Sequence, residues 1–174
     1  LTYVADKYAT KANQQGTRYP VDLYQCAKCG HVQTIDLLPI ETLFSSDYTY
    51  KPSNNPRLIK HFNYYATQVA KNLGFIPKSS LDIGSNDGLF LECLNRLFGT
   101  DVVGIDPVEA AAKAAEHRNV RTINSFFNLE LAKELKAKNN NFDHISANNV
   151  FAHNDDLNGF TEGISLLLKN KGLF

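Results

Sequence analysis

Short apolar segments alternate with longer segments of helical periodicity from residue 79 to the end of the chain. Five of these segments have the length and composition of strands: residues 79–84, 101–106, 120–124, 142–149 and 171–174. Because two parallel strands need a crossover of about a dozen residues or more between them, this spacing predicts parallel pairing with a helix in each connection. We therefore expect an α/β fold with a doubly wound, mostly parallel sheet. Ligands of such sheets bind outside the carboxyl ends of the strands.

The N-terminal part of the chain has a different character. Two β-like runs, VDLYQC and HVQTIDL, are joined by the turn AKCG and show no helical period. A helical pattern begins at Asn55, with Pro56 at its first position, and stops at Gly74. We therefore expect a small β module with a loop at residues 1–53 and an α/β domain at 54–174. The chain lacks Met at position 1 and ends on a strand-like segment, so we expect it to be a piece of a longer protein.

Composition narrows the classes of function. Eighteen basic residues balance eighteen acidic ones, so no overall positive field would attract nucleic acid. No apolar stretch reaches the ~18 to 20 residues of a membrane helix, and the start of the chain lacks the apolar region of a signal peptide. Three cysteines, two of them in a C-x-x-C pair, fit a reducing compartment better than a disulfide framework. We expect a cytoplasmic protein that acts on a small molecule.

The turn after the first strand of the α/β domain carries the first chemical signal. In the sequence DIGSNDG, Asp82 ends the strand, Gly84 lies in the turn and Gly88 precedes a helix. A dinucleotide-binding fingerprint would have Gly in place of Asn86, so that the backbone can approach a pyrophosphate. A cofactor without phosphates needs no such approach, but an amino-acid tail needs carboxylate and carbonyl acceptors for its ammonium group. S-adenosylmethionine has such a tail.

The second strand also ends on an acidic residue, Asp106. At this position a carboxylate can accept hydrogen bonds from both hydroxyls of a ribose. Acidic residues at two consecutive strand ends therefore predict a nucleoside-containing cofactor. The alternative interpretation is local: Asp before Pro is a good helix entry, and the glycines of the first turn would serve turn and cap chemistry alone.

Several segments together resemble a known enzyme family. The segments RYPVDLYQCAKCGHVQ, DIGSNDG, GIDP, SFF, ANNVFAH and LLLKNKG are similar to those of zinc-binding, S-adenosylmethionine-dependent sugar C-methyltransferases. The resemblance covers nearly the whole chain, and the combination of DIGSNDG with ANNVFAH and an upstream C-x-x-C hairpin makes it specific. It implies a class I methyltransferase fold, which is Rossmann-like, with a small zinc-ribbon-like module. It also implies C-methylation of a ketosugar on a nucleotide carrier.

The resemblance assigns site residues as well. It implies that the cofactor lies among Gly84, Asn86, Asp87, Asp106 and Asn148, with Phe126 or Phe127 near the adenine. Ordinary core packing is the alternative for the two Phe residues. With the strand-end Asp82 and the turn residue Gly88, these residues form the predicted cofactor site.

Zinc is implied by the resemblance but only in part by the residues. Cys26 and Cys29 supply two thiols, whereas a structural zinc ion needs four ligands. The family carries a second C-x-x-C upstream of this hairpin, and the chain begins after that point. His31 is a weaker candidate for a ligand, and Cys93 falls on the buried face of a predicted helix as a small core residue. We therefore expect half of a zinc site in this chain.

Methyl transfer to carbon needs a base, because the carbon beside a ketone becomes nucleophilic only when its proton is removed. Within the chain the candidates are His153, just after the fourth strand, and the hydroxyls of Tyr48 and Tyr50 in the loop at residues 45–56. That loop is aromatic and polar, and it could cover a polyhydroxyl substrate or serve as a plain connector. The resemblance implies that the catalytic base comes from a C-terminal region, which we expect to lie outside this chain. We expect the chain alone to bind cofactor without turnover.

Three other classes of function fit the residues less well. An NAD-dependent oxidoreductase would keep the parallel sheet, but Asn86 replaces the required Gly. A methyltransferase for nucleic-acid bases would show an Asn/Asp-Pro-Pro-aromatic turn after the fourth strand, where this chain has ANNVFA. A zinc-ribbon binding module without activity would explain Cys26 and Cys29 and leave the acidic strand ends without a role.

Overall fold

The computed structural model describes residues 2–3, 18–36, 38–44 and 48–174. The chain divides into two compact units, Leu1–Tyr50 and Lys51–Phe174, and each is described by itself. The start of the predicted loop, residues 45–47, lies outside the described residues.

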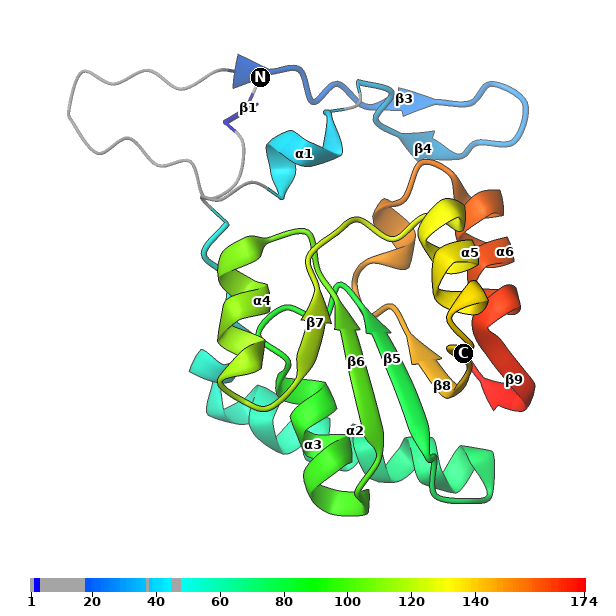
Figure 1. The fold of residues 1–174 in the computed structure, drawn as a ribbon. Helices are drawn as coiled ribbons and strands as arrows, with labels where there is room; N and C mark the ends of the chain where they lie inside the picture. The colour runs from blue at the N-terminus through cyan, green and yellow to red at the C-terminus, as the bar shows by residue number, and fades with distance from the viewer. Residues whose placement is uncertain (1, 4–17, 37, 45–47) are drawn as a thin grey trace. The chain divides into compact units, whose positions relative to one another are not determined.

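The second unit is built on a sheet of five parallel strands (Figure 1). The strands are β5 (Ser79–Ile83), β6 (Asp101–Ile105), β7 (Arg121–Ile123), β8 (Phe142–Ser146) and β9 (Leu168–Leu173). Their order in the sheet is β7-β6-β5-β8-β9, and every neighbouring pair is parallel. The order reverses between β5 and β8, which is where open α/β sheets bind their ligands. The predicted parallel sheet is confirmed, although β9 begins earlier than the sequence pattern indicated.

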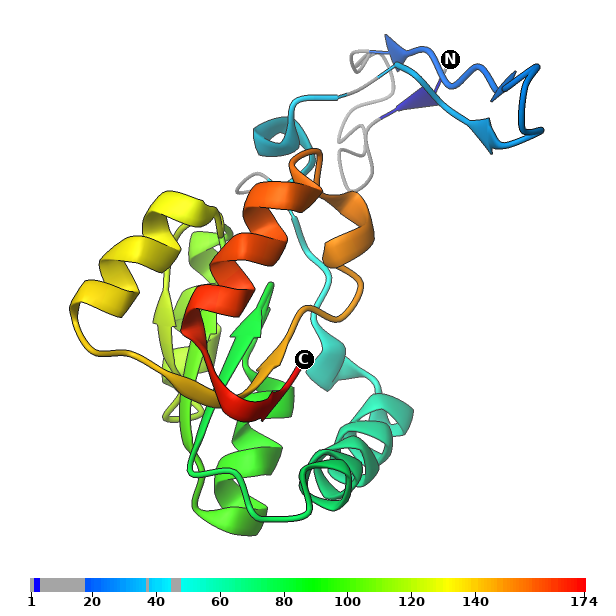
Figure 2. The same cartoon turned by 90° about the vertical axis from the view of Figure 1, so that its right-hand side faces the viewer.

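Helices cover both faces of this sheet (Figures 1 and 2). One face carries α2 (Pro56–Leu73), α3 (Leu89–Phe98) and α4 (Glu109–Glu116), and the other carries α5 (Leu129–Ala137) and α6 (Leu157–Leu167). Each face has its own apolar cluster. Leu91 and Leu94 of α3 are fully buried in one, and Leu81 and Ile145 of the strands in the other. Burying side chains of this size contributes about 1.5 to 3 kcal/mol each.

The helix α2 begins and ends where its sequence predicts. The side chain of Asn55 accepts a hydrogen bond from the backbone N–H of Arg57, and Pro56 occupies the first turn. Gly74 ends the helix at a φ of 75°. Its apolar stripe packs Ala66 and Val69 against α3.

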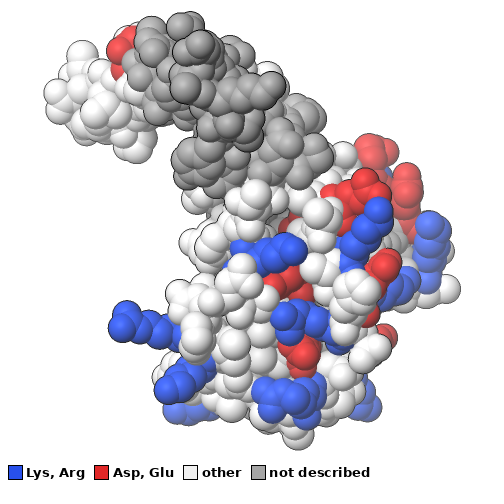
Figure 3. Space-filling model, turned by 90° about the vertical axis from the view of Figure 1, so that its left-hand side faces the viewer, with Lys and Arg blue, Asp and Glu red and all other residues white. Residues whose placement is uncertain are grey.

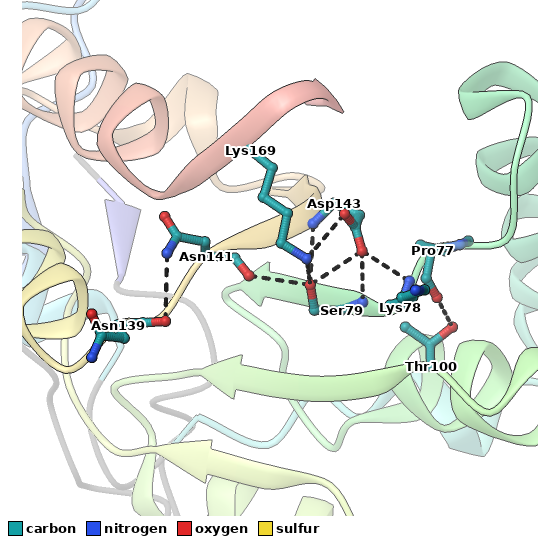
Figure 4. Close-up of polar contacts among 8 residues, drawn as sticks. All are labelled: Pro77, Lys78, Ser79, Thr100, Asn139, Asn141, Asp143 and Lys169. Carbon is teal, nitrogen blue, oxygen red and sulfur yellow. Dashed lines mark hydrogen bonds and ion pairs between the residues drawn. The ribbon is translucent and has the colours of Figure 1, made fainter.

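A polar network joins the strands at their amino ends (Figure 4). Oδ2 of Asp143 accepts hydrogen bonds from the backbone N–H groups of Lys78 and Ser79, at 2.9 Å and 3.1 Å. Its Oδ1 lies 3.0 Å from Nζ of Lys169, on β9. One carboxylate thus ties β8 to the beginning of β5 and to the edge strand β9, at the end of the sheet opposite the predicted site.

The surface of the second unit mixes both signs of charge. Acidic and basic side chains adjoin one another over part of the face shown in Figure 3. Lys113 pairs with Glu109 on α4 at 2.5 Å, and Arg118, just after α4, pairs with Glu92 of α3 at 2.6 Å. Within the described part of the chain, no helix is both long and apolar enough to cross a bilayer.

The first unit contains two small antiparallel strand pairs. β1 (Thr2–Tyr3) pairs with β2 (Arg18–Tyr19), and β3 (Tyr24–Gln25) pairs with β4 (Val32–Gln33). A short helix, α1 (Ile40–Leu43), follows. The pair β3–β4 is a hairpin, and the C-x-x-C segment forms its tip.

Candidate functional site

The turn between β5 and α3 explains the D-x-G-x-x-x-G spacing. Gly84 and Gly88 have φ angles of 70° and 74°, which residues other than Gly rarely adopt. A Cβ atom on Gly84 would lie 2.2 Å from Cγ2 of Val150, in the loop that follows β8. Asn86, at the position where a dinucleotide fingerprint has Gly, also has a positive φ of 50°. The turn therefore needs both glycines for its conformation, and it needs Gly84 also for close contact with the loop after β8.

Asp106 fixes this turn from the end of β6. Its Oδ2 accepts a hydrogen bond from the backbone N–H of Asn86 at 2.8 Å, and its Oδ1 accepts one from Val108 at 2.9 Å. Burial raises the pKa of Asp106, and these two hydrogen bonds oppose the rise. The hydrogen bond from Val108, the residue before α4, shows that Asp106 also has the local role at a helix entry. Because a carboxylate has about four acceptor sites, the group still has acceptor capacity for a ligand.

Asp82 is a second buried carboxylate, at the end of the neighbouring strand β5. Its exposed fraction is 5%, and it lies opposite Ser146 of β8 in the sheet register. The Ser146 hydroxyl donates to Oδ1 of Asp82 at 2.6 Å, the one hydrogen bond to this carboxylate among the described residues. Burial raises the pKa of Asp82 to about 7. The negative charge of Asp106 adds to this rise, and the hydrogen bond from Ser146 opposes it. A positively charged ligand group would therefore stabilise the ionised form.

Tyr65, on α2, is a partly buried tyrosine whose ring packs against Phe90 of α3 at 4.8 Å. Burial raises the pKa of the Tyr65 hydroxyl, the Asn148 side chain opposes that rise, and the charge of Asp82 adds to it. Asn148 is exposed in the loop after β8. Asn148 and Asp82 are among the site residues predicted from the sequence, whereas the helical spacing of Tyr65 indicates only a place on the apolar stripe of α2.

Asp87 lies in the same turn and has different partners. Its Oδ2 accepts a hydrogen bond from the backbone N–H of Ser53 at 3.3 Å, and Arg118 lies 4.0 Å away. Its Oδ1 is buried and has no hydrogen-bond partner among the described residues. Ser53 belongs to the short 3-10 helix η1 (Pro52–Asn54), so Asp87 connects the segment before α2 to the turn.

The other predicted residues of this unit are distributed around the sheet. Phe127 is buried and packs edge-on against Phe160 of α6 at 4.9 Å, so it belongs to the core. Phe126 is only partly buried, which makes it the better candidate for contact with adenine. His153 is exposed and ends the 3-10 helix η2 (Phe151–His153), in the same loop as Asn148.

The remaining predicted residues lie in the first unit. Cys26 and Cys29 are exposed free thiols. The backbone N–H groups of Cys29 and Lys28, with the Cys29 side chain, lower the pKa of the Cys26 thiol, which suits a metal ligand. Within the described ranges, however, no group of three or more His, Cys, Asp and Glu could hold a metal ion. Tyr48 and Tyr50 contact each other edge-on with ring centres 6.5 Å apart.

Comparison with known proteins shows which family the chain belongs to. Residues 81–174 match the model of a family described as a methyltransferase domain, and this match covers β5 to β9 with the turn and both strand-end acids. The chain belongs to this methyltransferase family. The predicted enzyme class, an S-adenosylmethionine-dependent methyltransferase, is confirmed.

One curated relative and two solved structures illustrate the likeness. The chain is 30% identical over 159 residues to the C-methyltransferase NovU of Streptomyces niveus, a match that covers 91% of this chain and 37% of NovU. It thus spans well under half the length of that relative. The plantazolicin methyltransferase BpumL, solved with SAH, is 24% identical with a TM-score of 0.55 over 68% of this chain and 47% of that one. DesVI of Streptomyces venezuelae is 16% identical with a TM-score of 0.53, over 72% and 57% of the two chains. These structures show that the fold is shared.

The geometry of the methyltransferase domain defines what its site can bind. Two buried carboxylates, Asp82 and Asp106, end neighbouring strands of the sheet. The first has a single hydrogen-bonded partner and a raised pKa, as expected of a group that accepts a cation. The second is held in place by two backbone N–H groups, as expected of a rigid acceptor for hydroxyl groups.

Proposed function

We propose that this chain is the cofactor-binding part of an S-adenosylmethionine-dependent C-methyltransferase that acts on a ketosugar carried by a nucleotide. The observation that carries the proposal is the pair of buried carboxylates, Asp82 and Asp106, at the ends of adjacent strands. Their spacing in the sheet suits a ligand with an ammonium group at one end and a ribose at the other. The 30% identity to a C-methyltransferase supports transfer to carbon.

In this proposal the domain's own residues bind and orient. Asp82 accepts the ammonium group of the cofactor, and Asp106 accepts hydrogen bonds from the ribose hydroxyls. The turn at Gly84, Asn86 and Gly88 lets the cofactor lie close to the backbone. Phe126 contacts the adenine ring. S-adenosylmethionine, when bound, supplies a methyl group on a positively charged sulfur.

The acceptor carbon must lose its proton before it can attack the methyl group. His153 is the proposed proton acceptor or acceptor-binding group of this chain, because it lies in the loop after β8 with Asn148. Tyr48 and Tyr50 are proposed to orient the sugar. A base supplied from outside this chain is the alternative, since the match covers 37% of the relative NovU.

Zinc is proposed only as a structural ion of the longer protein. Cys26 and Cys29 would supply two of its four ligands at the tip of the β3–β4 hairpin. The two thiols alone do not complete a site, so we derive no step of the reaction from zinc. Free thiols fit the reducing conditions of the cytoplasm, which we propose as the location of the protein.

A direct assay tests the proposed reaction. A longer protein that contains this chain should transfer a methyl group from S-adenosylmethionine to a 4-ketosugar nucleotide, and the His153→Asn variant should lower turnover more than cofactor affinity. A positioned base contributes about 10²- to 10⁴-fold, so the loss should be large if His153 is the base. If the base is supplied from outside this chain, the 174-residue chain should bind cofactor without turnover. Full activity of the short chain would instead place the base within it.

A further inference from the structure

The loop after β8, residues 147–153, is tightly hydrogen-bonded along its own backbone. The N–H groups of Val150 and Phe151 both donate to the carbonyl of Ala147 at 3.3 Å. The N–H group of His153 donates to the carbonyl of Val150 at 2.9 Å. These bonds join the turn after β8 directly to η2, so a side chain that fixes one part of the loop also fixes its neighbours.

Two successive apolar side chains anchor this loop on different elements. Val150 lies against the turn after β5, where a Cβ atom on Gly84 would collide with its Cγ2. The ring of Phe151 packs edge-on against the ring of Phe160, on α6, with ring centres 5.6 Å apart and an interplanar angle of 71°. Both side chains also pack against the apolar cluster on the α5–α6 face. The loop is therefore held by the turn at Val150 and by α6 at Phe151.

The anchor at Phe151 is itself well defined. Phe160 is 2% exposed, and a second ring, Phe127, packs edge-on against it with ring centres 4.9 Å apart. Phe151 also contacts Phe174 edge-on at 5.9 Å. Because aromatic pairs have preferred edge-on geometries, an aliphatic side chain in place of Phe151 would lose these contacts.

The packing of Phe151 also sets the direction of His153. The two are the first and last residues of η2, a 3-10 helix, which has about three residues per turn. Side chains two positions apart in such a helix therefore point in directions about 120° apart. With Phe151 packed against α6, His153 is turned away from the core and is exposed.

Resting on the proposed function, we propose that Phe151 is a positioning residue of the methyl transfer, whose ring, held by Phe160, keeps His153 at the acceptor. Phe151 acts in this role through His153. A displacement of about 1 Å greatly weakens a positioned group, so a change at Phe151 should lower the rate of transfer. Val150 holds the same loop at the turn after β5, so cofactor affinity should be kept.

A double-mutant cycle tests this role in a longer protein that contains the chain, with S-adenosylmethionine and a 4-ketosugar nucleotide. Phe151→Leu keeps an apolar side chain and removes the ring contacts. It should lower kcat roughly ten- to a hundredfold, with little change in the KM for S-adenosylmethionine. In the His153→Asn background the same substitution should have little further effect, because the group that Phe151 positions is already lost.

Phe142→Leu is the matched control for a general loss of packing. Phe142 belongs to the same apolar cluster and is 3% exposed, but it begins β8, at the amino end of the sheet. Its substitution should lower the melting temperature and leave kcat nearly unchanged at a temperature where both variants are folded. In the 174-residue chain, Phe151→Leu should bind SAH about as tightly as the unmodified chain does.

A second variant protects the test against misfolding. Phe151 is only partly buried, and Phe151→Met, which is closer to Phe in volume, should show the same dependence on His153. Equal losses of kcat with and without His153, or an unchanged kcat, would overturn the positioning role. If His153→Asn alone keeps full turnover, the proposed role of His153 fails, and that of Phe151 with it. If the unmodified protein transfers no methyl group to the ketosugar nucleotide, the proposed function fails, and both roles fail with it.

Discussion

At the scale of single residues, the site depends on two carboxylates with different surroundings. Asp106 accepts two backbone hydrogen bonds and holds the turn after β5, whereas Asp82 accepts one from the Ser146 hydroxyl and no other among the described residues. Burial raises the pKa of both, and for Asp82 to about 7. A carboxyl group with a raised pKa in the folded protein destabilises the fold when it is ionised. We interpret Asp82 as a residue kept for binding at a cost in stability.

The pKa of Asp82 leads to a prediction about pH. Below about pH 7, Asp82 of the free protein is mostly protonated. A ligand with an ammonium group binds the ionised carboxylate, so its binding must displace that proton. The affinity for SAH should therefore fall as the pH is lowered from 8 to 6, by at most about tenfold per pH unit. Calorimetric titrations at several pH values measure this dependence.

The control for this prediction is Asp82→Asn, which cannot ionise. Its affinity for SAH should be weaker at pH 8 and should vary little between pH 6 and pH 8. In the absence of ligand, the same variant should be more stable than the unmodified chain at pH 8, because it removes a buried charge. A pH dependence that persists in Asp82→Asn would contradict the assignment.

At the scale of elements, Asp143 holds three strands together at the amino end of the sheet. Its partners are the backbone of Lys78 and Ser79, at the start of β5, and the ammonium group of Lys169 on β9 (Figure 4). Burial alone would raise the pKa of Asp143. The hydrogen bonds from Lys169, Lys78 and Ser79 outweigh burial and lower the pKa below its ordinary value of 3.8.

We expect Asp143→Asn to lower the free energy of unfolding by about 1.5 to 3 kcal/mol at pH 7, the range for hydrogen bonds to a charged group. Because the folded-state pKa is the lower one, this stabilisation is complete above about pH 4 and disappears as the pH falls through the folded value. Urea unfolding at pH 7 and pH 3 measures both numbers. Asp101→Asn, an exposed Asp at the start of β6, is the control and should change little. An equal deficit at both pH values would contradict the ionic role of Asp143.

At the scale of the whole molecule, the sequence predicted the parts that follow from periodicity. The alternation of strand and helix patterns predicted the parallel sheet, and Asn55, Pro56 and Gly74 predicted the bounds of α2. The role of Asp143 could not be predicted, because its partners lie far along the chain and the buried strand around it has an ordinary apolar pattern. Only the folded arrangement brings Asp143 to Lys78, Ser79 and Lys169.

The central claim is that the two strand-end carboxylates bind S-adenosylmethionine. Isothermal titration calorimetry of the 174-residue chain with SAH and with NAD, under the same conditions, tests it most directly. We expect saturable binding of SAH with one site per chain, and much weaker binding of NAD, because Asn86 replaces the Gly that a pyrophosphate needs. Binding of NAD as tight as that of SAH, or tighter, would contradict the account.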